Sequence, residues 1–211
     1  MGPRMILDNE IKKLIEQRIE EIEKEYQQTQ GLILTEDDLK CQICMELNQI
    51  PNLSKPERTN NAQNVYAANV HTEISWYDLN DKLAIKPDIT ILNPENLSIL
   101  PSDKLKLPSK GCSFSGDAII FELKFIRGQN GITQRTIASI EKDVKKIQGL
   151  FERLRALGAT NKIFCYFVVF NKTDKKKHNF DSFIEEHRNN DKYKIIYGTG
   201  KVVFPKQQKN V

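Results

Sequence analysis

The chain lacks any apolar run long enough to cross a bilayer, which takes about 20 consecutive residues, and its mean hydropathy is −0.52. The amino terminus lacks the charged-then-apolar pattern of a secretory signal, so we expect a cytoplasmic protein. Cysteine is scarce, and the four cysteines among 211 residues make no convincing disulfide framework. The sequence therefore predicts a soluble domain that depends on an apolar core, with no membrane partner.

The one close cysteine pair is Cys41 and Cys44. No second cysteine pair or histidine pair accompanies it to complete a zinc site. The pair falls in an expected helix, where a three-residue step places both side chains on one face. We therefore interpret both as core-packing residues.

Charge is unevenly distributed along the chain. Residues 1–121 hold 13 basic and 19 acidic residues, a net charge of −6, whereas residues 122–211 hold 19 and 9, a net charge of +10. Polyanion binding is the functional interpretation, because each neutralised phosphate releases counterions. A solvated lysine-rich surface is the alternative.

Apolar periodicity and turn residues predict the order of the elements. The expected elements are helices over 8–28 and from Thr35 to about Ile50, a hairpin of strands 70–77 and 83–92, a strand over 117–126, a helix over 133–157, a strand over 162–170, a helix over 180–188, a strand over 193–197 and a frayed basic tail from 198 to 211. This order predicts an α/β protein with a central mixed β-sheet flanked by helices.

The first expected helix carries a narrow apolar stripe among many charges, with Asp8 as its N-cap. Such a helix packs either on its own domain or against a second copy of the chain. We treat residues 1–30 as an N-terminal helical arm and residues 31–211 as the main domain.

Charged residues interrupt two of the expected strands. Asp88 follows Pro87 within Leu83–Leu92, and Glu122 and Lys124 lie within Ala118–Ile126. Because side chains alternate along a strand, Glu122 and Lys124 share one face and their apolar neighbours occupy the other. Buried charges need partners or a metal. An ion pair on a solvent-exposed strand is the alternative.

Pro87-Asp88 and Glu122-Leu123-Lys124, followed by a long amphipathic helix and an apolar strand, resemble the PD-(D/E)xK nuclease superfamily over about residues 35–170. The resemblance implies a restriction-endonuclease-like αβββαβ core preceded by the N-terminal helix. It also implies a magnesium-dependent endonuclease that hydrolyses DNA, with Mn²⁺ as a substitute ion, in restriction or phage defence.

The resemblance also assigns roles at this motif. Asp88 and Glu122 are the expected metal ligands, with the carbonyl of Leu123 as the third. Lys124 would orient or deprotonate the attacking water, or stabilise charge on the phosphate. The rival interpretation is a nuclease-like module that binds nucleic acid or protein in a larger complex without catalysis. A third is an oligomerisation scaffold built on the first helix.

Further acids lie near the expected site. The hairpin brings Glu73 across from Asp88, as an auxiliary catalytic acid or as the partner of a cross-strand ion pair with Lys86. Superfamily members often carry another glutamate on the first core helix, for which Glu36 and Glu46 are candidates; helix capping explains Glu36 equally well.

Basic and amide side chains follow the Glu-x-Lys strand. Arg127, Gln134 and Arg135 flank the amino end of the next helix, where a helix can bind phosphate, and Lys145 lies further along its polar side. These four are the expected DNA contacts, although Lys145 is equally explained as solubilising. A nuclease that cuts both strands would act as a homodimer.

Overall fold

The computed structural model describes residues 7–60, 64–77, 83–99, 112–114, 116–156 and 162–204. Its elements are α1 (Asn9–Gln28), α2 (Glu36–Leu47), β1 (Glu57–Arg58), β2 (Tyr66–Ala67), β3 (Val70–Thr72), β4 (Trp76–Tyr77), β5 (Leu83–Ile85), β6 (Ile89–Leu92), the 3₁₀ turn η1 (Pro94–Asn96), β7 (Leu97–Ile99), β8 (Cys112–Phe114), β9 (Ala118–Ile126), α4 (Gln134–Ala156), β10 (Ile163–Asn171), α5 (His178–Glu186) and β11 (Tyr193–Thr199). None of the described helices is long and apolar enough to span a membrane.

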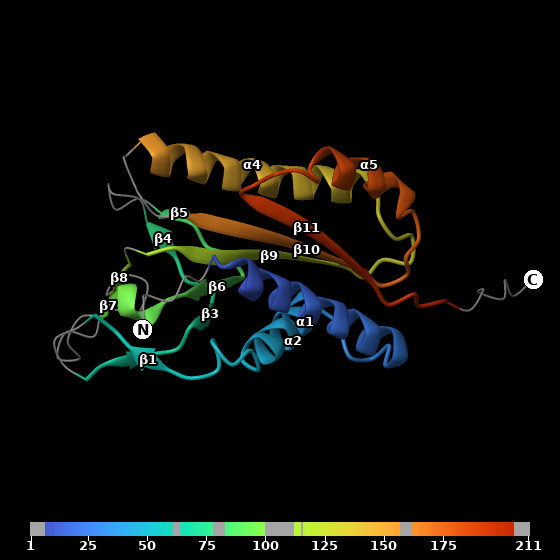
Figure 1. The fold of residues 1–211 in the computed structure, drawn as a ribbon. Helices are drawn as coiled ribbons and strands as arrows, with labels where there is room; N and C mark the ends of the chain where they lie inside the picture. Colours follow the sequence, from blue (N-terminus) through green and yellow to red (C-terminus); the bar gives the residue numbers. More distant parts are fainter. Residues whose placement is uncertain are drawn as a thin grey trace, which may run out of the picture.

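The centre of the fold is a five-stranded mixed sheet in the order β11-β10-β9-β6-β3 (Figure 1). Strands β3, β6 and β9 pair antiparallel, whereas β10 runs parallel to both β9 and β11. Helix α4 connects the parallel strands β9 and β10, as such a crossover requires. The α/β class with a mixed sheet between helices is therefore confirmed.

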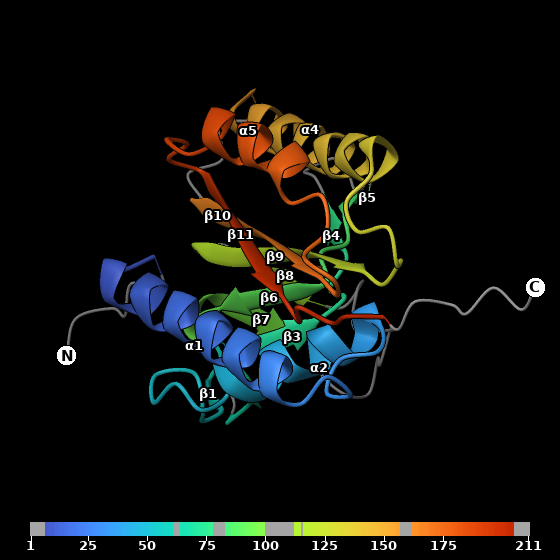
Figure 2. The ribbon, with the colours of Figure 1, turned by 90° about the vertical axis from the view of Figure 1, so that its right-hand side faces the viewer.

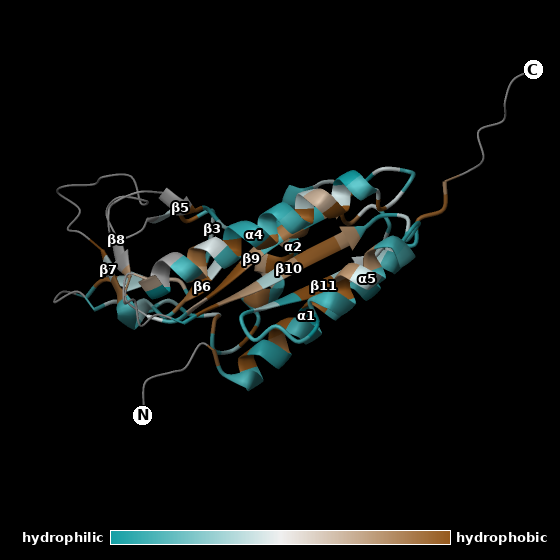
Figure 3. Cartoon of the chain, turned by 90° about the horizontal axis from the view of Figure 1, so that it is seen from above, coloured by the Kyte–Doolittle hydropathy of each residue, from teal (hydrophilic) through white to brown (hydrophobic). Residues whose placement is uncertain are grey.

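Helices cover both faces of this sheet (Figure 2). Helices α1 and α2 lie on one face, where Ile15, Ile19 and Leu39 pack against Phe121 and Tyr166. Helices α4 and α5 lie on the other face with a second apolar cluster. Seen from above, the strands are hydrophobic and the outer helix surfaces hydrophilic (Figure 3). Of the two arrangements open to the first helix, α1 packs on its own domain.

Local sequence explains where the first two helices begin. The side chain of Asp8 accepts a hydrogen bond from the Glu10 N–H, as expected of an N-cap. Thr35 and Asp38 form a reciprocal capping box at the start of α2. This box fixes the first turn of α2, which carries Glu36.

The expected hairpin is present but broken in the middle. Each predicted strand becomes two short strands, so that β3 pairs with β6 and β4 pairs with β5. The breaks fall at Glu73, which has a positive φ of 54°, and at Pro87, which has no N–H to donate. The outer half of the hairpin leaves the sheet, and Trp76 and Ile85 pack against the α4 side. Its turn, residues 78–82, lies outside the described residues.

Two smaller expectations were wrong. Cys41 is exposed and only Cys44 packs against the core, because the three-residue step leaves one cysteine at the margin of the buried face. The chain from 198 to 202 is not frayed: β11 extends to Thr199, Gly200 N–H donates to the Asn171 carbonyl, and Val202 N–H donates to the Lys172 carbonyl. The end of the helix at Leu157 and the tail from 205 lie outside the described residues.

Candidate active site

Strand β9 continues beyond the strand that pairs with it. The ladder between β6 and β9 ends at the pair Ile89 and Phe121, and the Asp88 N–H donates to the Phe121 carbonyl at 3.0 Å. From Glu122 to Ile126, β9 keeps β10 on one side, and no strand of the described ranges pairs with its other side. A strand edge leaves backbone N–H groups that need acceptors.

Two carboxylates accept these hydrogen bonds. Asp88 Oδ2 accepts from the Leu123 N–H at 2.8 Å, and Glu36 Oε2 accepts from the Phe125 N–H at 3.0 Å. The carbonyl of Leu123 points to the same edge, because both polar groups of a strand residue lie on one side of the strand. The edge of β9 therefore holds two carboxylates and a backbone carbonyl.

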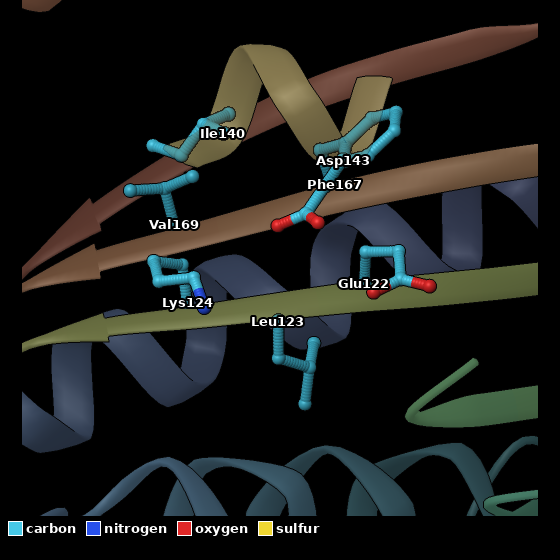
Figure 4. Close-up of a pocket in the computed structure, with 7 residues that line it drawn as sticks. All are labelled: Glu122, Leu123, Lys124, Ile140, Asp143, Phe167 and Val169. Atoms are coloured by element: carbon cyan, nitrogen blue, oxygen red, sulfur yellow. The ribbon is translucent and has the colours of Figure 1, made fainter. Parts of the chain in front are cut away.

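The side chains of β9 alternate as expected. Leu123 projects toward α1 and α2, opposite to Glu122 (Figure 4). Glu122 and Lys124 line a small pocket beneath α4, together with Ile140, Asp143, Phe167 and Val169. The two motif side chains therefore share one partly buried site.

Burial and neighbouring charge disfavour ionisation of the motif acids. Burial, with the negative charges of Asp88 and Asp143, raises the pKa of Glu122 to about 8 against the opposing charges of Lys146 and Lys124. Burial and the charge of Glu36 raise the pKa of Asp88, although the Leu123 N–H opposes this. Asp88 and Glu122 are thus close enough to interact, and the nearby lysines do not fully offset their charges.

Asp143 is a site residue that the sequence reasoning missed. It extends from α4 toward the sheet (Figure 4), is 20% exposed, and pairs with Lys146 at 2.7 Å. One signal was available: Asp143 lies three residues after the buried Ile140 and directly before the buried Val144, at the border of the apolar stripe. An acid in that position faces the sheet margin.

Of the two helix glutamates considered from the sequence, only Glu36 reaches the site. Its Oε2 lies 3.7 Å from Lys124 Nζ in addition to accepting from the Phe125 N–H. Glu46 instead pairs with Arg18 at 3.3 Å. Capping at the start of α2 is carried by Thr35 and Asp38, so the Glu36 carboxylate is available to β9.

Glu73 lies beside Asp88, as the hairpin predicted, since the Glu73 N–H donates to the Asp88 carbonyl at 3.1 Å. Its carboxylate forms ion pairs with Lys40 at 2.8 Å and Lys86 at 2.6 Å. The hydrogen bonds from these lysines lower the pKa of Glu73 to about 2. The cross-strand ion pair is thus present, and a catalytic role for Glu73 stays a prediction.

The four expected DNA contacts lie apart from the carboxylates. Arg127, Gln134 and Arg135 are exposed beyond the carboxyl end of β9. Lys145 is exposed on α4 and pairs with Glu141 at 2.8 Å. Arg127 is separated from Lys124 by two residues, whereas Lys145 lies along α4.

The oxygen groups at the edge of β9 suit a hard divalent cation. The described residues contain no cluster of three or more His, Cys, Asp or Glu side chains arranged around a metal position. Mg²⁺ keeps several waters, however, and is commonly bound through only one or two carboxylates. Asp88, Glu122 and the Leu123 carbonyl therefore form a chemically adequate set.

Comparisons with known proteins identify no relative: no family model, curated protein or solved structure matches this chain.

Proposed function

We propose that the protein is a magnesium-dependent nuclease that hydrolyses DNA phosphodiester bonds at the carboxylate edge of β9. One observation carries the proposal. Asp88 and Glu122, distant in sequence, lie close enough to interact electrostatically where the pairing of β9 with β6 ends, and both pKa values are raised. A pair of partly buried, uncompensated carboxylates favours a cation, and perturbed acids of this kind are typical of functional sites.

Asp88, Glu122 and the Leu123 carbonyl would hold the cation. Bound there, Mg²⁺ would supply Lewis-acid polarisation of a phosphoryl oxygen and neutralise charge that develops during hydrolysis. The hydrogen bond from the Leu123 N–H to Asp88 Oδ2 holds one of these ligands in place. The site is therefore preorganised by the backbone of β9 itself.

Lys124 carries the positive charge on the same face as Glu122. Its ammonium group is suited to bind a phosphate oxygen, and Glu36, 3.7 Å away, limits where that group lies. Glu36 thus acts as a positioning residue for Lys124. Glu73, engaged by Lys40 and Lys86, holds α2 against the hairpin and supports the Asp88 backbone.

DNA is the substrate class that the charge distribution favours. The half of the chain that begins at Glu122 has a net charge of +10, and a polyanion is attracted by such a surface. The finer assignment to a restriction-endonuclease-like core, and to restriction or phage defence, belongs to this proposal and depends on the motif resemblance. A dimer would be needed if both strands are cut at one position.

The rival is a nuclease-like module that binds nucleic acid without cutting it. The edge hydrogen bonds support it, because Asp88 and Glu36 satisfy backbone groups of β9 whether or not a cation binds. The burial of Glu122 favours the nuclease, since among the described residues this carboxylate has no hydrogen-bond or ion-pair partner, and burial raises its pKa. A purely structural position would more readily carry glutamine.

A cleavage assay with separate metal titration tests the proposal. Purified wild type is incubated with single- and double-stranded DNA and with RNA, in Mg²⁺, in Mn²⁺ and in EDTA. We expect cleavage only with a divalent ion, and a loss of roughly 100-fold or more for Glu122→Gln, because one carboxylate ligand is removed. Glu21→Gln, on α1, is the matched control and should cleave like wild type.

Calorimetric titration of Mn²⁺ without DNA gives a second readout that does not depend on activity. Binding should weaken about 10-fold or more in Glu122→Gln and Asp88→Asn relative to Glu21→Gln. A wild type that is inert on every substrate and binds Mn²⁺ no better than Glu122→Gln would favour the non-catalytic module.

A further inference from the structure

The loops that follow the three parallel strands gather at one end of the sheet (Figure 1). They and the first turn of α4 carry seven basic side chains. These are Arg127, Arg135, Lys172, Lys175, Lys176, Lys177 and Lys201, which we call the basic end; all are exposed except Lys172, which is half-buried.

Backbone pairing places these loops side by side. The register aligns Ile126 of β9 with Asn171 of β10, and Asn171 with Thr199 of β11. Lys172 N–H donates to the Ile126 carbonyl at 2.9 Å, and Val202 N–H donates to the Lys172 carbonyl at 2.8 Å. The basic residues that follow the strands therefore form one surface.

The loop before α4 is attached to the same surface. Ile132 N–H donates to the Lys175 carbonyl at 3.2 Å. Gly131 has a positive φ of 66°, and a Cβ there would collide with the Lys175 carbonyl. Glycine is thus required for this close approach. This contact joins the loop before α4 to residues 172–177, which we call the lysine turn.

The lysine turn itself is held in one conformation from beneath. The buried Asn171 amide donates to the Lys175 carbonyl and to the Tyr197 hydroxyl, each at 3.1 Å. The Tyr197 hydroxyl in turn donates to Asp174 Oδ1 at 2.7 Å. Asp174 and Lys176 have positive φ values of 57° and 60°, a backbone state that costs roughly 1 kcal/mol or more each for a residue other than glycine.

Among the residues that the structure describes, the basic side chains of the basic end have no acidic partners. Elsewhere, Lys145 and Lys146 on α4, Arg188 just after α5 and Lys194 on β11 each pair with a carboxylate. Within the described ranges, none of the seven basic-end residues has a carboxylate oxygen within 4.0 Å. The one acid of the turn, Asp174, accepts from Tyr197 instead.

From this juxtaposition we infer that the basic end is a preorganised binding surface for the sugar–phosphate backbone of duplex DNA. A solvated face would not need a strained backbone and a buried amide network to hold like charges together. Naming DNA rests on the proposed function. Arg127 follows Lys124 by three residues, or about 10 Å of strand, and phosphates recur about every 3.4 Å of duplex axis. A backbone lying on the basic end therefore reaches the carboxylate edge within about three nucleotides.

The surface is tested by DNA binding in EDTA, where cleavage does not contribute. Fluorescence anisotropy measures the affinity for a labelled duplex of about 20 base pairs over a range of salt concentrations. The variant Lys175→Gln/Lys176→Gln/Lys177→Gln is compared with Lys13→Gln/Lys24→Gln/Lys55→Gln, which removes the same charge from exposed sites on α1 and the loop after α2.

We expect the turn variant to lose about 10-fold or more in affinity at low salt, and its salt slope to fall by about 2 to 3, because each lost phosphate contact lowers the slope by about 0.9. The control triple should stay within about 3-fold of wild type. Arg127→Gln/Lys201→Gln, on the loops that follow β9 and β11, should reproduce the loss independently of the turn's own fold.

Equal losses in the turn and control triples would overturn the inference, since net charge alone would then explain binding. The inference would also be overturned if wild type bound polyglutamate through the turn lysines as tightly as it binds DNA. That result would indicate an acidic protein as the partner of this surface. DNA binding through the basic end without any cleavage would sink the nuclease and leave the surface standing.

Discussion

Both halves of β9 pair with β10 on one side, but they differ in what lies on the other side. From Ala118 to Phe121 the strand lies between β10 and β6, and all four residues are buried. From Glu122 onward β9 does not pair with β6. The carboxylates of Asp88 and Glu36 accept hydrogen bonds from the backbone N–H groups on that side. One continuous strand thus serves as core at its start and as candidate site at its end.

The difference shows how a sheet creates a charged site without a loop. A strand edge inside a fold demands hydrogen-bond acceptors. Carboxylates supply them, and the same carboxylates have oxygens left to bind a cation. Stability and the proposed chemistry therefore compete at the same atoms, which makes the two halves of β9 respond differently to mutation.

The largest expected effect is in the first half. Phe121 is fully buried and stacks on Tyr166 with ring centroids 5.3 Å apart. Phe121→Ala should lower the free energy of unfolding by about 3–5 kcal/mol, because transfer and cavity costs add. Urea denaturation measures it. Lys124→Met, in the second half, should change stability by less than about 1.5 kcal/mol; equal losses in both variants would erase the contrast.

The next effect is a pH dependence from Glu122. Its pKa is about 8 in the fold against an ordinary 4.5, so the folded state holds a proton that the unfolded state releases. Stability should therefore fall as pH rises from about 4.5 to about 8, and level off above. One pKa unit corresponds to about 1.4 kcal/mol, and partial exposure reduces the full value, so we expect a loss on the order of 2–4 kcal/mol.

Glu122→Gln, which cannot ionise, isolates this contribution when its urea denaturation is followed from pH 5 to pH 9 beside that of wild type. The three histidines are common to both proteins and cancel in the difference. The variant should be the more stable of the two at pH 9 and lose the excess slope. Parallel curves would mean that Glu122 is not desolvated.

The smallest expected effect on stability concerns Asp88. It separates the role of this side chain as a hydrogen-bond acceptor for β9 from the role of its charge. Asp88→Ala leaves the Leu123 N–H without its acceptor and should cost about 1–3 kcal/mol. Asp88→Asn retains an acceptor oxygen and should cost less than about 1 kcal/mol. Thermal and urea unfolding compare them. Both variants should lose divalent-ion binding, so a fold-preserving Asn variant that binds Mn²⁺ normally would remove Asp88 from the proposed site.

Local signals explain which parts of the fold could be predicted. The N-cap at Asp8, the capping box at Thr35 and the alternation along β9 depend on residues within four positions of one another. The broken hairpin was not predictable in this way. Pro87 marks one break, but the positive φ of Glu73 has no signal in the neighbouring residues, and Glu73 pairs with Lys40 of the distant α2.

The residues of the candidate site also differ in whether a local sequence signal predicts them. The Glu-x-Lys pair and Pro-Asp can be recognised from spacing alone. Glu36 reaches β9 across 89 residues, and capping offered an adequate explanation for it until Thr35 and Asp38 were seen to cap α2. Asp143 had a weak signal, an acid at the border of an apolar stripe, which many surface helices share.

By itself the sequence determined the main helices, the long strands, their order and the face of β9 on which Glu122 and Lys124 lie, because helix and strand periodicities are properties of neighbouring residues. Only the tertiary structure decided that the ladder between β6 and β9 ends at the pair Ile89 and Phe121, and hence that the edge of β9 beyond Phe121 is completed by carboxylates. Strand ends depend on which distant segments pair, and desolvation depends on what covers them, so neither can be read from local pattern.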